Sequence, residues 1–419
     1  MSSNITAVEE AVEVSSVESV LAAGIETPAY VYDMGEVRAN YKRLRAALPV
    51  GSEIYYSLKA NPHPFVLATL RSQGALPEVC SIGELDQAIA AGWFASQVLY
   101  TGPAKRDQDV RYALVTGVRY FSVDSANALD QLNDLATEVN CEVSCLLRIN
   151  DDQPIAGQGL AMTGVPSQFG ADLQLVLSNP KQYTNRERVR VTGLHLYMGT
   201  NIAEAESLLL QFERSIATSV KLIDVLREHD VEIRTLDLGG GFGAPFAQTG
   251  HAFHFEGLSQ GLEELCETYF SRKANDFPHI VFESGRYLIG TAGSLLTRVL
   301  DVKISHGKSF AILDSGINHL GGMSGLRRLP PLNPHLVHQR EAPYIQYAVT
   351  GPLCTPLDIW SRNSNLPALE SGDLLIVPNV GAYGLYASLI GFLGHPAPME
   401  VVIDNGCVVN VSQLELVRR

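Results

Sequence analysis

Short β-rich runs alternate with runs of helical periodicity between residues 36 and 284. Segments such as Glu36–Leu48 and Ile202–Glu228 repeat apolar residues at the spacing of one helix face. About eight such units follow one another, which is typical of a parallel sheet wrapped by helices and predicts a closed (β/α)8 barrel, an α/β fold. The strand candidates are Glu53–Ser57, Leu76–Cys80, Gln97–Thr101, Val118–Ser122, Glu142–Ile149, Val189–Leu196, Glu232–Leu238 and His279–Glu283.

After about residue 286 the helical pattern stops and the chain becomes strand-like, with Gly and Pro in the connections. The strand candidates there are Thr297–Ile304, Phe310–Leu313, Tyr344–Val349, Asp373–Val377 and Glu400–Asp404. The segment up to about Asp33, with a strand candidate at Ala29–Tyr32, is expected to join this region. We therefore predict a barrel over residues 36–284 and a mainly β domain formed by residues 1–35 and 285–419.

Length and charge narrow the functional classes. The chain has 419 residues, which suits two domains, and its formal net charge of −14 would repel nucleic acid and an anionic membrane surface. These properties favour a small-molecule substrate over nucleic acid or a membrane surface.

No stretch of about 18 apolar residues, as a membrane-spanning helix would need, occurs in the sequence, and the N-terminus carries Glu9, Glu10 and Glu13. Its six cysteines form no Cys-x-x-Cys pair, so we interpret them as reduced thiols in a cytosolic protein, and we predict no metal cofactor.

Unusual residues follow the predicted strands at the end where a barrel collects its chemistry, the carboxyl ends. They are Lys59 after the first strand, Arg148 at the fifth, His195–Thr200 at the sixth, Gly239–Gly243 at the seventh and Glu283–Arg286 at the eighth. Residues distributed by chance would not all fall at this one rim of the predicted barrel.

Lys59 lies at the edge of an apolar strand. Burial there would lower its pKa and leave a neutral amine able to form an imine with an aldehyde. The alternative is an ordinary solvated lysine.

The consecutive glycines Gly239, Gly240 and Gly241 follow a strand, and their unhindered amides can close around a phosphate. The loop formally matches a dinucleotide fingerprint. We reject that reading because Pro245 and Phe246 stand where a helix should start. A purely structural tight turn remains an alternative.

Glu283 and Arg286 flank Gly285, which permits close approach of a ligand. Arginine grips phosphate, and a glutamate can keep a ring nitrogen protonated. In isolation the pair could be a surface ion pair. Together with Lys59 and the glycine loop, it predicts a pyridoxal-phosphate site.

At these residues the chain resembles the fold-type III pyridoxal-phosphate decarboxylases, the family of ornithine, arginine and diaminopimelate decarboxylases. The resemblance covers nearly the whole chain. Its motifs are the Schiff-base segment at Lys59, Glu78–Glu84, Phe121–Ser125, Ser167–Gly170, the phosphate-binding residues Gly239–Gly241 and Arg286, the pyridine-nitrogen partner Glu283, Gly351–Cys354 and Gly381–Tyr383. The resemblance implies an alanine-racemase-like barrel with a β domain, bound pyridoxal 5'-phosphate, and a homodimer in which Cys354 enters the partner's active site.

The chain departs from the family pattern at several positions. Tyr197 replaces a histidine that stacks on the cofactor, and Thr200 replaces a serine that bonds the phosphate. Thr355 stands where the ornithine and diaminopimelate enzymes have an acidic residue that binds the distal end of the substrate. Gly322 stands where the diaminopimelate pattern has an arginine, a role that Arg327 could take over. These departures resemble the branch of antibiotic and siderophore pathways, where the distal end can be acylated or tethered to a carrier protein.

The resemblance implies release of CO2 and an amine, with Lys59 and Cys354 as catalytic residues. His195 is also expected to bind the cofactor. The candidate substrate contacts are Arg148, Thr355, Asp358 and Arg327. The alternatives are a diaminopimelate decarboxylase of lysine biosynthesis, a racemase on the same fold, against which Glu283 argues, and a non-catalytic single-barrel cofactor protein, against which the long β domain and Cys354 argue.

Overall fold

The computed structural model describes residues 19–152, 164–270, 277–321, 332–338 and 342–418. The chain divides into two compact units. One comprises Arg38–Gly243 and Phe253–Leu288, and the other Met1–Val37, Ala244–Ala252 and Ile289–Arg419. The short segment Ala244–Ala252 therefore leaves the first unit and joins the second.

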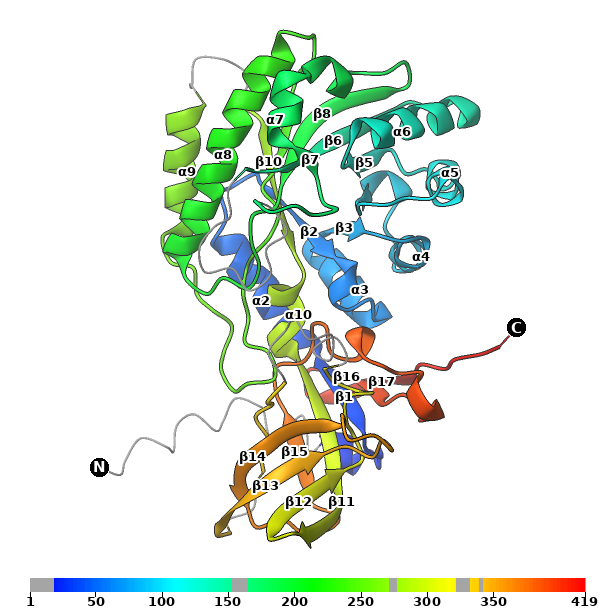
Figure 1. Cartoon of the computed structure of the whole chain (residues 1–419), viewed down its shortest axis with the longest axis vertical. Helices are drawn as coiled ribbons and strands as arrows, with labels where there is room; N and C mark the ends of the chain where they lie inside the picture. The colour runs from blue at the N-terminus through cyan, green and yellow to red at the C-terminus, as the bar shows by residue number, and fades with distance from the viewer. Residues whose placement is uncertain (1–18, 153–163, 271–276, 322–331, 339–341, 419) are drawn as a thin grey trace. The chain divides into compact units, whose positions relative to one another are not determined.

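The first unit is a closed barrel of eight parallel strands, as the sequence predicted (Figure 1). The strands pair in the order β2, β3, β4, β5, β6, β8, β9, β10, and β10 pairs with β2 to close the ring. The strands are β2 (Glu53–Ser57), β3 (Leu76–Val79), β4 (Leu99–Tyr100), β5 (Tyr120–Val123), β6 (Val143–Asn150), β8 (Val189–Leu196), β9 (Thr235–Asp237) and β10 (His279–Ser284), with β7 (Ala171–Asp172) paired to β6.

Helices between the strands cover the outside of the barrel, and α8 lies beside α9 in Figure 1. The helices are α2 (Met34–Ala46), α3 (Pro64–Gln73), α4 (Ile82–Ala90), α5 (Asp107–Thr116), α6 (Ala126–Val139), α7 (Leu173–Ser178), α8 (Ala205–Arg227), α9 (Leu258–Tyr269) and the short α10 (Arg286–Ile289). Capping residues determine where two of these helices begin. The side chains of Ser81, before α4, and Ser125, before α6, each accept a hydrogen bond from the backbone N–H three residues further on, as N-cap residues do.

The second unit is a mainly β domain, also as predicted. Its sheet runs in the order β14, β13, β12, β11, β1, β16, β17, and β15 pairs with β11. The strands are β1 (Ala29–Asp33), β11 (Gly293–Ser305), β12 (Lys308–Leu313), β13 (Tyr344–Thr350), β14 (Ile359–Pro367), β15 (Leu374–Val377), β16 (Met399–Asp404) and β17 (Cys407–Gln413). The N-terminal strand β1 lies between β11 and β16, where Val31, Leu296 and Val401 share a buried apolar cluster.

None of the helices in the described ranges combines the length and apolar content that crossing a membrane requires.

Candidate active site

Lys59 lies in a single 3-10 turn directly after β2, and its amine faces the carboxylate of Glu78 on the neighbouring strand β3. The Nζ atom of Lys59 is 3.1 Å from Oε2 of Glu78, whose side chain is 1% exposed. The side chain of Lys59 itself is 45% exposed. The expectation that Lys59 is buried is therefore wrong: its side chain is exposed at the mouth of the barrel and has a carboxylate partner.

Glu78 is held as an anion by its surroundings. Burial alone would raise its pKa, but the charge of Lys59 and hydrogen bonds from Ser57, Thr101 and Cys80 lower it to about 2. The Thr101 hydroxyl donates to Oε1 of Glu78, and Sγ of Cys80 lies 3.2 Å from the same oxygen. The carboxylate thus stays ionised across the physiological range and orients the amine of Lys59.

Three ionisable side chains meet inside the barrel at the ends of β8, β9 and β10. His195, Asp237 and Glu283 are buried, and their potential ligand atoms lie within 4.8 Å of one another. His195 Nε2 lies 3.6 Å from Glu283 Oε1, which is too long for a hydrogen bond. Among the described residues, His195 Nε2, Asp237 Oδ2 and Glu283 Oε1 are buried polar atoms without a hydrogen-bond partner. Such orphaned atoms point to a ligand that completes them.

Burial and like charges shift the protonation of this cluster. Burial, with the charges of Asp237 and Glu78, raises the pKa of Glu283 well above its usual value. Burial raises the pKa of Asp237 to about 7. Burial and the charge of Arg148 keep the pKa of His195 well below its usual value, so the imidazole is neutral. The cluster therefore suits a ligand nitrogen that can share a proton with one of these carboxyl groups.

Two residues that the sequence did not single out support His195. Ser122 Oγ on β5 lies 2.9 Å from His195 Nδ1. Lys105 Nζ donates to the carbonyl oxygens of Gly102, at 2.6 Å, and Ser122, at 2.7 Å, and burial lowers the pKa of Lys105 to about 8. Both residues, like Asp237, lie at or just after the end of a barrel strand, and that position is the signal that could have identified them.

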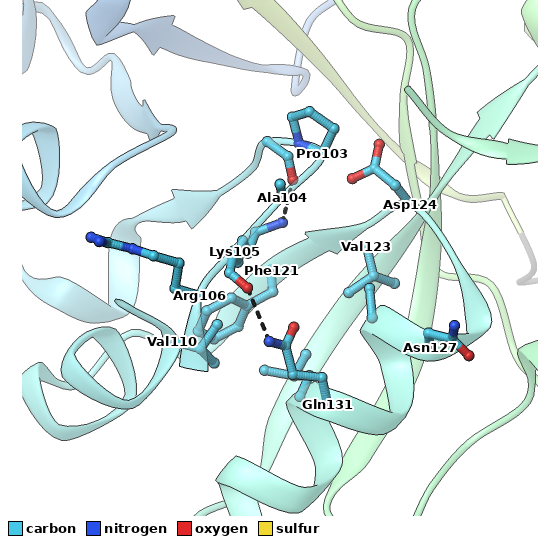
Figure 2. A pocket seen from close by; sticks show the side chains of 13 residues that line it. Pro103, Ala104, Lys105, Arg106, Val110, Phe121, Val123, Asp124, Asn127 and Gln131 are labelled. Atoms are coloured by element: carbon cyan, nitrogen blue, oxygen red, sulfur yellow. Dashed lines mark hydrogen bonds between the residues drawn. The ribbon is translucent and has the colours of Figure 1, made fainter. Parts of the chain in front are cut away.

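A cavity of about 450 Å³ opens beside Lys105 (Figure 2). The backbone oxygen of Lys105 accepts a hydrogen bond of 2.9 Å from Gln131 Nε2 on its wall. Apolar side chains such as Phe121 and Val123 form part of the lining, and Asp124 lies across from Lys105. Lys59 is not among the lining residues, so this cavity is separate from the lysine–carboxylate site.

The predicted glycine loop follows β9 and packs too closely for side chains. A Cβ atom on Gly239 would lie 2.8 Å from the Tyr197 ring, and one on Gly240 would lie 2.6 Å from the Glu283 carbonyl oxygen. Asp237 Oδ1 accepts a hydrogen bond from the Gly239 N–H at 2.8 Å. The next helix begins only at Leu258, which agrees with the rejection of a dinucleotide site.

The remaining predicted barrel residues lie on the same rim. Thr200 follows β8 by four positions, and Arg286 begins α10 directly after β10. A Cβ on Gly285 would lie 2.8 Å from Ala60, which packs the end of β10 against the Lys59 turn. Arg148, 8% exposed, places its guanidinium 4.8 Å above the centre of the Phe169 ring.

The second unit carries the other predicted residues. Cys354 is exposed and Thr355 half-exposed in the turn between β13 and β14. Asp358 is 2% exposed, and its two oxygens accept hydrogen bonds from backbone N–H groups. Tyr383 adopts a φ of 55° just after Gly381, where a Cβ would lie 2.0 Å from a carbonyl oxygen. Arg327 lies outside the described residues.

Residues 34–290 match the pyridoxal-binding domain of the pyridoxal-dependent decarboxylases. The L-glutamyl-[BtrI acyl-carrier protein] decarboxylase of Niallia circulans is 31% identical over 96% of this chain and 93% of its own length. A diaminopimelate decarboxylase of Methanothermobacter thermautotrophicus is 31% identical over 93% of this chain and 89% of its own length. The crystal structure of the M. jannaschii diaminopimelate decarboxylase with L-lysine superimposes with a TM-score of 0.82 at 24% identity, covering 93% of this chain and 90% of that one.

The barrel with a lysine, a glycine loop and buried carboxylates on one rim defines a pyridoxal-phosphate enzyme. The chain belongs to the pyridoxal-dependent decarboxylases. It releases CO2 from an amino acid or amino-acid-like substrate with pyridoxal 5'-phosphate as cofactor. The site fits that cofactor on its own geometry, because the buried Glu283 oxygen that lacks a hydrogen-bond partner can meet a ring nitrogen.

Proposed function

We propose that this decarboxylase acts on a substrate whose distal end is acylated or tethered to a carrier protein. The observation that carries the proposal is Thr355, which follows Cys354 where free diamino-acid decarboxylases have an acid. Thr355 offers a half-exposed hydroxyl, and its oxygen accepts a hydrogen bond of 3.3 Å from the Leu357 N–H. A distal ammonium would lack a charged partner there, which weakens discrimination for a free diamino acid.

Two relatives support a derivatised substrate. The Niallia circulans relative is named for a glutamyl group on an acyl-carrier protein. A Staphylococcus aureus relative, 27% identical over 88% of this chain and 92% of its own length, is a 2-[(L-alanin-3-ylcarbamoyl)methyl]-2-hydroxybutanedioate decarboxylase, whose substrate name contains an amide-linked alanine. In both names the amino-acid part is joined to a larger group.

We assign the following roles to residues of the barrel. Lys59 binds the cofactor aldehyde, and Glu78 orients the Lys59 amine through the 3.1 Å contact. Glu283 holds a proton at the ring nitrogen of the cofactor, and the neutral His195 lies next to it. When bound, pyridoxal phosphate supplies an electron-withdrawing ring that accepts the electrons of the breaking Cα–carboxylate bond.

In this proposal Tyr197 would stack on the cofactor ring. The residues that would hold the phosphate are Gly239, Gly240, Gly241, Gly285, Arg286, Thr200 and Tyr383. The glycines supply amides without side chains, and arginine supplies a bidentate cation. Arg148 contacts the substrate.

Cys354 supplies the proton to Cα after CO2 leaves, from the partner subunit of a homodimer. Support for this part comes from the family motif and from the exposure of Cys354 in the unit that does not contain Lys59. A cytosolic location is part of the same proposal and agrees with six free cysteines.

The test is a CO2-release screen with the purified protein and pyridoxal phosphate. Free diamino acids, their distal acyl derivatives and carrier-bound amino acids are compared by kcat/KM. We expect an acylated or carrier-bound substrate to exceed every free diamino acid. A second candidate, diaminopimelate decarboxylase, is favoured by the 31% identical relative of that name, and meso-diaminopimelate as the best substrate would establish it instead.

A further inference from the structure

Asp358 lies four residues after Cys354, and its carboxylate is turned into the protein. Oδ1 accepts a hydrogen bond of 2.9 Å from the Ile317 N–H, and Oδ2 accepts one of 2.8 Å from the Leu353 N–H. The residue is 2% exposed. A buried carboxylate bonded to two backbone amides fixes those amides more strongly than a neutral acceptor would.

Two glycines close over the same carboxylate. A Cβ on Gly316 would lie 2.2 Å from Asp358 Oδ1, and one on Gly351 would lie 2.4 Å from Oδ2. No other residue type fits at either position without displacing the carboxylate. Glycine is therefore required here by close approach rather than by backbone angle.

The hydrogen bonds of the segment close it into a compact turn. The Gly351 N–H donates to the Asp358 carbonyl oxygen at 3.2 Å, and the Thr355 N–H donates to the Leu353 carbonyl oxygen at 2.8 Å. Cys354 stands at the exposed tip between these bonds. Since Leu353 is the residue directly before Cys354, the Asp358–Leu353 bond fixes the backbone from which the thiol projects.

We propose that Asp358 is a positioning residue, which sets the place of the Cys354 thiol by anchoring the turn to the Ile317 backbone. This proposal rests on the proposed catalytic role of Cys354. It replaces our expectation that Asp358 binds the substrate directly. A proton donor held to within a fraction of an ångström is what the rate of proton transfer requires, and misplacement by about 1 Å can cost roughly 100-fold in rate.

The experiment uses the holoenzyme with Asp358→Asn and, as a second route to the same defect, Gly351→Ala. In Asp358→Asn an NH2 group replaces one acceptor oxygen, so one backbone amide loses its partner. In Gly351→Ala the new methyl group would lie 2.4 Å from Asp358 Oδ2 and 2.5 Å from the Gly316 Cα, so it displaces the carboxylate and the Gly316 backbone next to it. The matched control is Glu400→Gln, which removes another carboxylate of 2% exposure from the same unit, one that accepts from Tyr386 Oη at 2.8 Å.

Three readouts separate positioning from simple destabilisation. Hydrogen exchange at amides 317 and 353 reports the anchor, and alkylation of Cys354 relative to the other exposed cysteine, Cys407, reports the thiol. Steady-state kinetics report kcat and KM. We expect faster exchange at one of the two amides in Asp358→Asn and at both in Gly351→Ala. In both variants we expect a changed alkylation ratio and kcat lowered about 10- to 100-fold with KM nearly unchanged. Glu400→Gln should leave all three unchanged.

Unchanged exchange at amides 317 and 353 in Asp358→Asn would overturn the anchor. Full kcat in Asp358→Asn beside an inactive Cys354→Ala would overturn the positioning role while leaving the role of Cys354 intact. An active Cys354→Ala variant would refute the catalytic role of the thiol, and with it the positioning role, while the exchange data still decide whether Asp358 anchors the turn.

Discussion

The amine of Lys59 lies 3.1 Å from a carboxylate oxygen of Glu78, and the two residues come from neighbouring parallel strands. Glu78 is buried whereas Lys59 is not, so the carboxylate is the fixed partner and the amine the movable one. The buried carboxylate of Glu78 therefore holds the amine of Lys59 in place at the barrel mouth. This relationship leads to the first two predictions.

Substitution Lys59→Ala should abolish decarboxylation and the covalent attachment of pyridoxal phosphate. The physical reason is that no other amine at the mouth has the same turn after β2 and the same carboxylate partner. Borohydride reduction of the wild type, followed by peptide mapping, should place the pyridoxyl group on Lys59. Finding it on Lys105, a half-buried amine whose pKa is lowered, would refute the assignment.

Substitution Glu78→Gln should move the attachment of pyridoxal phosphate to lower pH, by about one unit or more, because an adjacent carboxylate stabilises the ammonium form of Lys59. The attachment rate is followed by cofactor absorbance across a pH series. Glu53→Gln is the control, since Glu53 is an exposed acid at the opposite end of β2, 3.2 Å from His279. Identical pH profiles for Glu78→Gln and wild type would contradict the prediction.

Mixing inactive Lys59→Ala and Cys354→Ala chains should restore part of the activity. In a shared-site dimer one of the two mixed sites has both an intact lysine and an intact cysteine, so about a quarter of the wild-type activity is the ceiling for random exchange. Subunit exchange is verified with differently tagged chains. If tagged subunits exchange and no activity returns, the active site is not shared.

Substitution Thr355→Glu should raise kcat/KM for free meso-diaminopimelate by about tenfold or more, since a new acid can pair with the distal ammonium and roughly 1.4 kcal/mol is tenfold in rate. The same change should lower kcat/KM for a distally acylated substrate. Thr355→Ser, which keeps the hydroxyl, serves as the control. A variant whose preference between the two substrates matches the wild type would count against Thr355 as a specificity residue.

Two buried histidines should make the fold sensitive to acid. Burial lowers the pKa of His63 and of His319 to about 4, and an unfolded histidine titrates near 6.5. Below pH 6.5 the unfolded chain binds more protons, so the free energy of unfolding falls as pH drops from about 6.5 to about 4, by at most about 3 kcal/mol per histidine.

Substitution His63→Asn should remove the share of that pH dependence that His63 contributes, while keeping a residue able to cap α3. Denaturant unfolding at pH 7 and pH 5 measures it. The control is His306→Asn, an exposed loop histidine with a φ of 48° that asparagine also tolerates. Equal pH slopes for His63→Asn and wild type would show that His63 does not carry the effect.

The sequence by itself determined the order of the elements and the rim on which the chemistry stands. The predicted strands Glu53–Ser57 and Val189–Leu196 have the same bounds as β2 and β8, because both segments are rich in aromatic or β-branched residues, which favour strands. By contrast β14 and β17 were missed, since their exposed, partly polar residues, as in Ile359–Pro367, give a weak strand pattern.

Only the tertiary structure decided which side chains meet. Ser122 and His195 are 73 residues apart, and Lys59 and Glu78 are 19 apart, yet each pair is in contact because parallel strands bring their carboxyl ends together. The sequence placed Lys59 directly after the first barrel strand, as observed, but predicted that it is buried, whereas its side chain is exposed. It also made Asp358 a candidate substrate contact, whereas the folded turn directs its oxygens to backbone amides. The pattern of apolar and polar residues along a segment shows only which regular structure that segment favours. Burial, charge partners and protonation depend on neighbours distant in the chain, which only the closed barrel and the folded sheet supply.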